Sequence, residues 1–342
     1  MHNLLRRIML GGAAGCGVVL IAKAITRNRG LESLRGKNVL ITGGSRGLGL
    51  LLAREFARQG ARVAICARHS DQLDRAREDL RSHGADVWAR TCDVSDPEQV
   101  RRFMTEVTAE FGSVDVLVNN AGTIQVGPVA SMIAEDFDFA LKSIFWGALN
   151  MIFAVLPQMR ARRDGCIVNV TSIGGKVSIP HLLPYSCAKF ALQALSEGLR
   201  AELAREGITV TTVVPGLMRT GSHVNAQFKG RQQEESAWFG LSASLPLISM
   251  NAERAARIIV RATQRGDIEK TISLPASVLA RAHALFPGPV ISLLSLVNRF
   301  ILPKAEGGEA GAAGGRDLPS QPGILRLLMS LGQAAARHYN QL

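Results

Sequence analysis

Short apolar runs alternate with helical stretches along the middle of the chain. Six runs have the length and residue types of buried strands, at 38–42, 62–67, 87–91, 114–119, 165–171 and 208–214. Helical spacing of apolar residues predicts helices at 48–59, 71–82 and 97–111, the last with Asp96 as its N-cap. This alternation predicts an α/β fold in which a doubly wound parallel sheet is covered on both faces. A ligand would lie beyond the carboxyl ends of the strands.

Both ends of the chain depart from this alternation. Residues 1–30 contain an uncharged run from Ile8 to Ala22, which spans roughly 22 Å as a helix, short of a ~30 Å hydrocarbon core. Three interpretations stay open, namely a secretory signal, a targeting peptide and a retained membrane anchor, of which we favour the anchor. Beyond residue 275 we expect an apolar extension over 276–303, a flexible linker rich in Gly, Ala and Pro over 304–323, and an amphipathic helix over 324–342.

The composition fits a protein that buries a large core. Of the 342 residues, 47% are hydrophobic and 20% are charged, so neither disorder nor a collagen-like structure fits. The net charge of +12 comes from scattered basic residues without interleaved aromatics, so we expect no nucleic-acid partner. An anionic membrane surface or a phosphorylated cofactor explains this charge better. The five cysteines show no CxxC spacing, and no metal site is expected.

A glycine-rich stretch with the pattern TGxxxGxG follows the first predicted strand and opens the next helix. Glycines here permit a tight turn and let the backbone approach a pyrophosphate, while the helix N-terminus offers free N–H groups. The pattern predicts a dinucleotide site, and an ordinary glycine-rich loop is the alternative. The candidate cofactor contacts are Thr42, Gly43, Ser45, Arg46, Gly47, Leu48 and Gly49.

The second predicted strand ends without the acidic residue that would bind the ribose 2′-hydroxyl of NAD. Its end reads Ile65-Cys66-Ala67-Arg68, and no acid appears before Asp71. Arg68 and Arg46 are both placed to meet a 2′-phosphate, which a guanidinium recognises by charge and by paired hydrogen bonds. We therefore predict NADP(H) as the cofactor. The alternative for each arginine is a solvated surface side chain.

Two further turns fit the rest of a cofactor site. Asn119-Asn120-Ala121-Gly122 closes the fourth strand, where small residues leave room for a ligand. Pro215-Gly216 follows a later strand and resembles a turn near a nicotinamide. Taken alone, either stretch is also explained as a structural turn. The candidate contacts from these turns are Asn120, Ala121, Gly122, Pro215, Gly216 and Thr220.

A tyrosine and a lysine at helical spacing supply candidate acid–base chemistry. Tyr185 and Lys189 stand at positions i and i+4, which share one helix face. An ammonium nearby favours the phenolate, so the pKa of Tyr185 is expected to fall toward the working pH. Ser172 comes just after a buried strand, and its hydroxyl can hydrogen-bond a substrate oxygen where charge develops. A surface helix pair is the alternative for the tyrosine and lysine.

Taken in order, these motifs resemble the short-chain dehydrogenase/reductase family over roughly residues 34–275. The resemblance implies one Rossmann-like catalytic domain over 31–275, with a doubly wound parallel sheet of about seven strands. It implies Ser172, Tyr185 and Lys189 as the catalytic set, with Tyr185 and Lys189 also at the nicotinamide ribose. Asp93 and Val94 match the family position near the adenine. Family members commonly pair, so a homo-oligomer is expected.

One position departs from the family pattern. A helix before the catalytic serine usually carries an asparagine three residues ahead of a glycine, and here Ile144 stands three residues ahead of Gly147. That asparagine normally helps a water chain behind the lysine. We expect a different proton path rather than lost activity, with Ser143 as a partial substitute.

The leading hypothesis is an NADP(H)-dependent oxidoreductase that transfers a hydride between the nicotinamide and a carbonyl or secondary alcohol, with Tyr185 as acid/base. Apolar residues in the expected lid, 221–247, favour a lipophilic substrate. The segment 279–302 fits a pocket wall, a face resting on a membrane, or a core-packing helix pair.

A catalytically decayed NADP(H)-binding scaffold or sensor at a membrane is the alternative function. A nucleotide-sugar epimerase fits less well, because those relatives usually carry TGxxGxxG. Since the cofactor is kept inside cells, we expect a membrane-associated protein whose catalytic domain faces the cytoplasm, or otherwise a cytoplasmic protein.

Overall fold

The computed structural model describes residues 30–304, 311–319, 323 and 328–342, so the predicted N-terminal anchor or targeting segment lies outside the described residues apart from Gly30. The strands are β1 (Asn38–Thr42), β2 (Arg62–Ala67), β3 (Val87–Thr91), β4 (Val116–Asn119), β5 (Gln125–Val126), β6 (Gly165–Val170), β7 (Ile208–Pro215), β8 (Met218–Arg219), β9 (Gln227–Phe228), β10 (Met250–Asn251), β11 (Glu269–Ile272) and β12 (Ala313–Gly314).

The helices are α2 (Gly47–Arg58), α3 (Ser70–Ser82), α4 (Pro97–Phe111), α5 (Ala134–Leu141), α6 (Gly147–Arg162), α7 (Leu183–Leu203), α8 (Gln232–Ser244), α9 (Ala252–Arg265), α10 (Leu274–Leu285), α11 (Pro287–Phe300) and α13 (Ser330–His338). Short 3-10 turns are η1 (Val129–Ser131), η3 (Ile173–Gly175), η4 (Ala204–Glu206) and η5 (Ser222–Asn225), and η2 (Lys142–Trp146) is a π-helical turn between α5 and α6.

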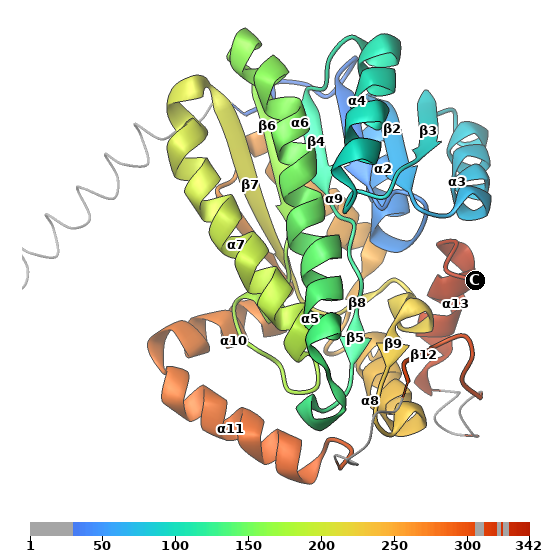
Figure 1. The fold of residues 1–342 in the computed structure, drawn as a ribbon, viewed down its shortest axis with the longest axis vertical. Helices are drawn as coiled ribbons and strands as arrows, with labels where there is room; N and C mark the ends of the chain where they lie inside the picture. The colour runs from blue at the N-terminus through green and yellow to red at the C-terminus, as the bar shows by residue number, and fades with distance from the viewer. Residues whose placement is uncertain (1–29, 305–310, 320–322, 324–327) are drawn as a thin grey trace, which may run out of the picture.

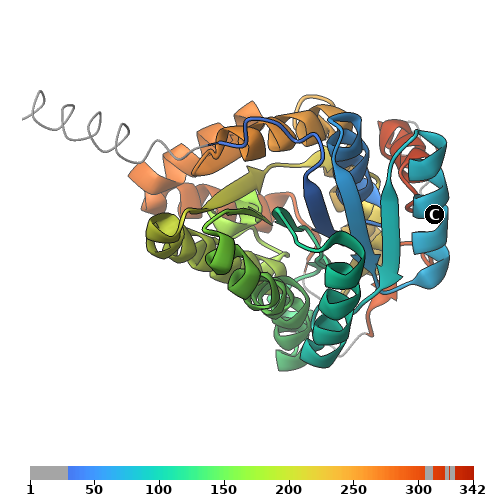
Figure 2. The same ribbon diagram turned by 90° about the horizontal axis from the view of Figure 1, so that it is seen from above.

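Seven parallel strands form the central sheet, in the order β11-β7-β6-β4-β1-β2-β3. The chain runs outward from β1 to β3, returns to β4 on the other side of β1, and continues outward to β11. Helices α4, α6 and α7 cover one face, and α2 and α9 cover the other (Figures 1 and 2). The predicted α/β fold with about seven parallel strands is thereby confirmed. The strand order reverses between β1 and β4, where sheets of this kind bind their ligands.

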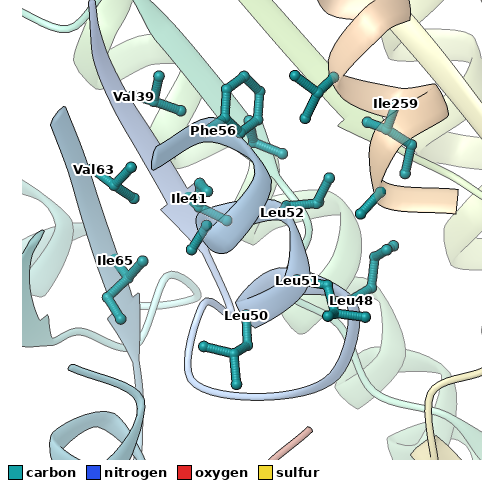
Figure 3. Packing of buried hydrophobic residues seen from close by; sticks show 14 of the residues in the cluster. Val39, Ile41, Leu48, Leu50, Leu51, Leu52, Phe56, Val63, Ile65 and Ile259 are labelled. Atoms are coloured by element: carbon teal, nitrogen blue, oxygen red, sulfur yellow. The ribbon is translucent and has the colours of Figure 1, made fainter. Parts of the chain in front are cut away.

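Successive residues of each strand serve opposite faces of the sheet. Val39 and Ile41 of β1 pack with Phe56 of α2 and Ile259 of α9 in one cluster (Figure 3), whereas Leu40 belongs to the cluster on the other face. All five side chains are buried, and each contributes about 1.5–3 kcal/mol by leaving water. Burial on both faces explains why the strands appear in the sequence as unbroken apolar runs.

Local signals set the helix ends close to their predicted places. Asp96 caps α4 as expected, because its carboxylate accepts hydrogen bonds from the N–H groups of Glu98 and Gln99. Pro97 occupies the first turn, where its missing N–H leaves no donor unpaired. The boundaries predicted for the strands and helices between residues 38 and 214 match the observed ones or differ from them by one or two residues.

The C-terminal part differs from the sequence prediction in two places. Residues 311–319 fall in the expected flexible linker, but β12 pairs antiparallel with β9, and the Gly315 N–H donates to the Ala226 carbonyl over 2.9 Å. These backbone bonds hold the stretch against the body of the protein. Helix α13 ends at His338, before the predicted helix end at 342, because Asn340 adopts a left-handed φ of 56°.

Among the described residues, the stretch Ala134–Arg162 is long and apolar enough to meet the criterion for a membrane span. It comprises α5, η2 and α6, and the α6 side chains Met151, Ile152 and Val155 are fully buried against the sheet. A core helix therefore accounts for its composition.

Gly207 and Gly198 are exposed and do not line the cavity. Replacing each of them with alanine should change the free energy of unfolding in opposite directions. Gly207 has φ +77°, and a Cβ there would lie 2.3 Å from the Arg163 carbonyl oxygen, so Gly207→Ala should destabilise the protein by about 1–3 kcal/mol. Gly198 is in the interior of α7 with open space around it, so Gly198→Ala should stabilise by up to about 1 kcal/mol. Urea unfolding of both variants beside wild type measures this, and shifts of the same sign would contradict it.

Candidate functional site

A cavity of about 590 Å³ opens at the carboxyl ends of the parallel strands. It is lined by most of the sequence-predicted site residues, which are Gly43, Ser45, Arg46, Gly47, Leu48, Gly49, Arg68, Asp93, Val94, Asn120, Ala121, Gly122, Ser172, Tyr185, Lys189, Pro215, Gly216 and Thr220. Thr42 is the exception, since it is buried behind the glycine-rich loop. Residues from six strand ends and from α2 and α7 thus share one space.

Thr42 joins the two loops on either side of the point where the strand order reverses. Its hydroxyl accepts hydrogen bonds from the backbone N–H groups of Asn120, at 3.0 Å, and Ala121, at 3.1 Å. The Asn120 amide in return donates to the Thr42 and Gly43 carbonyl oxygens, at 3.1 and 3.2 Å. Thr42 therefore positions the cofactor loop, in place of the direct contact that the sequence predicted.

Two positions of the loop need glycine because a Cβ there would collide with neighbouring backbone atoms. Gly43 has φ +64°, and a Cβ there would lie 2.9 Å from the Ala121 Cα. A Cβ on Gly49 would lie 2.1 Å from the Gly43 carbonyl oxygen. Helix α2 begins immediately, at Gly47, and its first turn contains no acidic side chain. The N-terminal N–H groups of a helix in this position suit a phosphate.

Cationic side chains gather where the second strand ends. Arg46 donates to the Asn225 side-chain oxygen over 2.6 Å and to the Gln72 side-chain oxygen over 3.3 Å, both of which are neutral. Burial, and then the charges of Arg316 and Arg68, lower the pKa of Arg46 to about 10. Arg46 and Arg68 are predicted from the sequence, whereas Gln72, Asn225 and Arg316 belong to no local motif and could not be predicted from it.

Asp93 and Val94 lie beside this cationic group at the end of β3. The Asp93 carboxylate accepts hydrogen bonds from the Ser95 N–H, at 2.9 Å, and the Ser95 hydroxyl, at 2.7 Å. A Cβ on Gly147 would lie 2.6 Å from Val94, so Gly147 allows the close packing of α6 here. Both residues lie at the wall of the cavity, and their contact with an adenine stays a prediction.

Ser172, Tyr185 and Lys189 meet at the other end of the cavity. Ser172 follows β6, and its hydroxyl oxygen accepts a hydrogen bond from the Gly174 N–H over 3.0 Å. A Cβ on Gly174 would lie 3.2 Å from the Tyr185 ring, and one on Gly175 would lie 2.8 Å from the Lys189 carbonyl oxygen. The two glycines therefore let the serine loop approach the helix that carries the tyrosine and lysine.

The electrostatics of this group differ from the sequence prediction. Burial lowers the pKa of Lys189 to about 7, and its Nζ donates to the Val170 carbonyl over 2.7 Å. Burial also raises the pKa of Tyr185, which a hydrogen bond with Ser172 opposes only in part. The expected fall of the Tyr185 pKa is therefore wrong for this arrangement. The Lys189 Nζ lies 5.6 Å from the tyrosine ring centroid, and loss of solvent outweighs its attraction.

Ile144 packs in a buried apolar cluster next to Lys189. It lies in the π-helical turn η2, is 1% exposed, and packs with Ala140, Ala148 and Leu192. A Cβ on Gly122 would lie 3.2 Å from Ile144 and 3.9 Å from the Lys189 Nζ, so the three residues are close neighbours. An apolar side chain thus stands where the family pattern has an asparagine.

Ser143, on the same turn, faces the cavity instead. Its hydroxyl lies 2.9 Å from the Thr123 hydroxyl and donates to the Ala140 carbonyl over 3.2 Å. Both residues line the cavity, whereas Ile144 does not. The role of Ser143 as a partial substitute in a proton path stays a prediction.

Apolar side chains dominate the rest of the cavity wall. Trp238 of α8 donates its indole N–H to Glu235 over 2.6 Å, and Glu235 lies 2.7 Å from His181 through its other oxygen. This buried chain of hydrogen bonds holds the ring against the cavity. Other apolar lining residues are Ile124, Phe139, Ile173, Ile179, Leu182, Leu217, Met218, Phe239, Ala243, Ile248, Pro275, Ala276 and Leu279.

Comparison with known proteins agrees with this geometry. Residues 37–229 match the model of the family described as short chain dehydrogenase. The chain belongs to that family. Its predicted membership is confirmed.

Among curated relatives, a dehydrogenase/reductase SDR family protein 7-like of Anopheles gambiae is 38% identical over 216 residues, which cover 60% of this chain and 68% of the relative. An actinorhodin polyketide ketoreductase solved with NADPH has a TM-score of 0.61 and 28% identity, covering 69% of this chain and 95% of that one. L-Sorbose reductase of Gluconobacter frateurii, solved with NADPH and L-sorbose, has a TM-score of 0.63 and 26% identity, covering 72% of this chain and 97% of that one.

The cofactor of both solved reductases is the one predicted from the sequence of this chain, whereas their substrates differ widely. A polyketide and a hexose share little beyond a carbonyl group. The family therefore supports nicotinamide chemistry, and the substrate has to be inferred from the cavity of this chain.

Lys189→Met should raise the free energy of unfolding at low pH. Below about pH 7 both folded and unfolded states carry the ammonium, and only the folded state bears the cost of burying it. Above pH 7 the folded state releases the proton that the unfolded state keeps, so wild-type stability rises with pH. The variant should gain about 1–3 kcal/mol at pH 6, and the gain should shrink by pH 9.5.

Urea unfolding at pH 6, 8 and 9.5 measures this difference. Lys304→Met, which removes an exposed ammonium, is the matched control and should change stability little at any pH. A gain from Lys189→Met that stays constant across this range would contradict the assigned burial of charge.

Proposed function

We propose that this chain is an NADP(H)-dependent oxidoreductase that interconverts a carbonyl and a secondary alcohol on a lipophilic substrate. One observation carries the proposal. The serine, tyrosine and lysine side chains line the same cavity as the glycine-rich loop and the paired arginines. A dinucleotide held by the loop at one end brings its nicotinamide toward the tyrosine at the other.

The acid–base roles follow from where each group sits. The nicotinamide supplies the hydride when the cofactor is bound. In the reducing direction, the Tyr185 hydroxyl gives its proton to the carbonyl oxygen, and the phenolate that forms is stabilised by the Lys189 ammonium. Ser172 donates a hydrogen bond to the same oxygen as its negative charge grows. The raised pKa of Tyr185 keeps the phenol protonated before transfer, as an acid requires.

The residues present fit NADP(H) better than NAD(H). No carboxylate stands at the end of β2, where NAD would need an acceptor for its ribose hydroxyls. Arg46 and Arg68 line that part of the cavity, and among the described residues the hydrogen-bond partners of the Arg46 side chain, Gln72 and Asn225, are neutral. A 2′-phosphate would be an anionic partner for these two guanidinium groups.

The substrate end of the cavity fits an apolar molecule. Trp238, Phe239, Leu182 and Ile179, from the lid and its neighbours, pack in one cluster and line the same cavity as Tyr185. A polyol such as a hexose would lose hydrogen bonds there without replacement. A ketosteroid, retinoid, long-chain ketone or 3-ketoacyl lipid presents the apolar surface that this wall can cover.

Tyr185→Phe distinguishes the proposed reductase from a catalytically decayed NADP(H)-binding scaffold. The scaffold is the alternative because Ile144 stands where the family pattern has an asparagine. The substitution removes only the hydroxyl, so turnover of a lipophilic ketone should fall by roughly 10²–10⁴-fold. NADPH affinity should stay within about twofold, because the ring and its packing are kept. NADPH oxidation against a panel of ketones and aldehydes measures the first quantity, and quenching of protein fluorescence measures the second.

Three outcomes would oppose the proposal. Undiminished turnover by Tyr185→Phe would remove its assigned role. Binding of NADPH without turnover of any carbonyl by wild type would favour the scaffold. Equal or better use of NADH would refute the cofactor preference.

The helix pair α10–α11 is the part of the chain that we assign to an anionic membrane surface. Its outward side chains are large and apolar, and they include Leu285, Phe286, Leu293, Phe300 and Ile301, each more than half exposed. No acidic residue occurs between Glu269 and Glu306, whereas lysines and arginines occur at 270, 281, 299 and 304. A surface that combines apolar and basic residues fits an anionic lipid interface. Because NADPH is kept inside cells, the catalytic domain faces the cytoplasm in this proposal.

Phe300→Glu should weaken binding to anionic vesicles severalfold, because it places a carboxylate on the apolar face. Val129→Glu is the matched control, since Val129 is also exposed but lies on η1 and not on the helix pair. Flotation of a chain that starts at residue 30, where the described fold begins, with phosphatidylserine vesicles measures the bound fraction. Equal losses from both substitutions, or binding unaffected by either, would contradict the assignment.

A further inference from the structure

The C-terminal end of the chain lies against the glycine-rich loop. Helix α13 lies next to α3 in Figures 1 and 2. The Arg75 guanidinium of α3 donates to the Asn340 side-chain oxygen over 2.8 Å. The Gly47 N–H donates to the Tyr339 carbonyl over 2.8 Å. Residues nearly 300 positions apart in the sequence are therefore joined at the first turn of α2.

The side chain of Asn340 stabilises this contact through hydrogen bonds. Its amide donates to the Ser45 carbonyl over 2.8 Å and to the Gln72 carbonyl over 2.9 Å. The first acceptor belongs to the glycine-rich loop and the second to α3. One amide group thus ties the loop that carries Arg46 to α3, the helix that follows β2, next to the place where the ribose phosphate of a bound cofactor would lie.

Gln341 continues the contact into the cavity. It is 4% exposed and is part of the cavity wall. The Asn225 amide donates to its backbone and side-chain oxygens, each over 2.8 Å, while the other atom of that amide accepts from Arg46. Arg316 also donates to the Gln341 carbonyl. Arg46 and Arg316 are therefore linked through Asn225 and Gln341.

The charges at this point are one-sided. Arg46, Arg68 and Arg316 are close enough that the latter two act on the first electrostatically. Within residues 30–304, 311–319 and 328–342, none of these three guanidinium groups forms an ion pair with a carboxylate. Like charges held together without a counter-ion repel one another, and a bound dianion would reverse the sign of that interaction.

We propose that Arg316 and the C-terminal residues 339–342 complete the 2′-phosphate subsite, with Arg316 as a third guanidinium and the tail as a clamp on the glycine-rich loop. This inference rests on the proposed function and extends it. Arg316 determines the preference for NADP(H) over NAD(H), because only the phosphorylated ribose carries the charge it meets. Asn340 acts on both cofactors alike, because it positions the loop that holds the pyrophosphate.

Cofactor affinity of three full-length variants separates these roles. Arg316→Leu should weaken NADPH binding roughly tenfold, as expected for the loss of one charge-assisted contact, and NADH binding less than about twofold. Arg316→Lys should restore part of the NADPH affinity. Arg337→Leu is the matched control, because Arg337 lies on α13, is exposed and carries the same charge. It should change neither affinity.

Nicotinamide fluorescence titration at fixed ionic strength gives the dissociation constants, and Asn340→Ala should weaken NADPH and NADH by similar factors. If Arg316→Leu leaves the ratio of the two affinities unchanged while wild type prefers NADPH, the role of Arg316 is refuted and the proposed function stands. If Asn340→Ala has no effect on either cofactor, the clamp is refuted. If wild type binds NADH as tightly as NADPH, the cofactor preference itself fails, and the role of Arg316 fails with it.

Discussion

The contact between the loop after β1 and the loop after β4 is the constraint on which the cavity depends. Thr42 and Asn120 exchange hydrogen bonds across the reversal of strand order, and Gly43 lets the two backbones approach. Helix α2 begins directly after the first of these loops, and Gly122 in the second neighbours both Ile144 and the Lys189 ammonium. A displacement here would therefore alter the phosphate end and the catalytic end together.

Features that depend on neighbouring residues could be predicted from the sequence, and features that depend on burial or on distant segments could not. The apolar runs of 38–42 and 62–67 are strands because both faces of the sheet are covered, which their composition already indicates. The pKa of Tyr185 was predicted wrongly because helical spacing reveals the neighbouring lysine but not the loss of water around both groups. The composition of residues 311–319 suggests a linker, yet their backbone pairs with β9, and backbone pairing leaves little trace in a short Gly-Ala stretch.

Several features of the site cost stability, and their positions agree with a functional origin. Lys189 is buried, and its Nζ donates a hydrogen bond to the Val170 carbonyl. Arg46, Arg68 and Arg316 lie close together, and within the described part of the chain no carboxylate forms an ion pair with them. Natural proteins tolerate such arrangements where binding or catalysis depends on them. The cofactor would relieve the repulsion among the arginines, so binding of NADP(H) should couple to the stability of the loop, α3 and the tail that surround them.

The two C-terminal extensions act at opposite ends of the cavity. Gln341 lines the cavity near Arg46 and is hydrogen-bonded to Arg316, and Asn340 is hydrogen-bonded to Arg75 of α3, whereas α10 contributes Pro275, Ala276 and Leu279 to the apolar wall. Figure 1 shows α10–α11 and α13 on opposite sides of the molecule. An apolar substrate dissolved in a membrane beneath α10–α11 would reach Tyr185 along an apolar wall, without crossing water. The charged cofactor would enter from the side that faces away from the lipid. Under the proposed function, this division would let one cavity take reactants of opposite polarity, and both segments lie outside residues 37–229, the part of the chain that matches the family model.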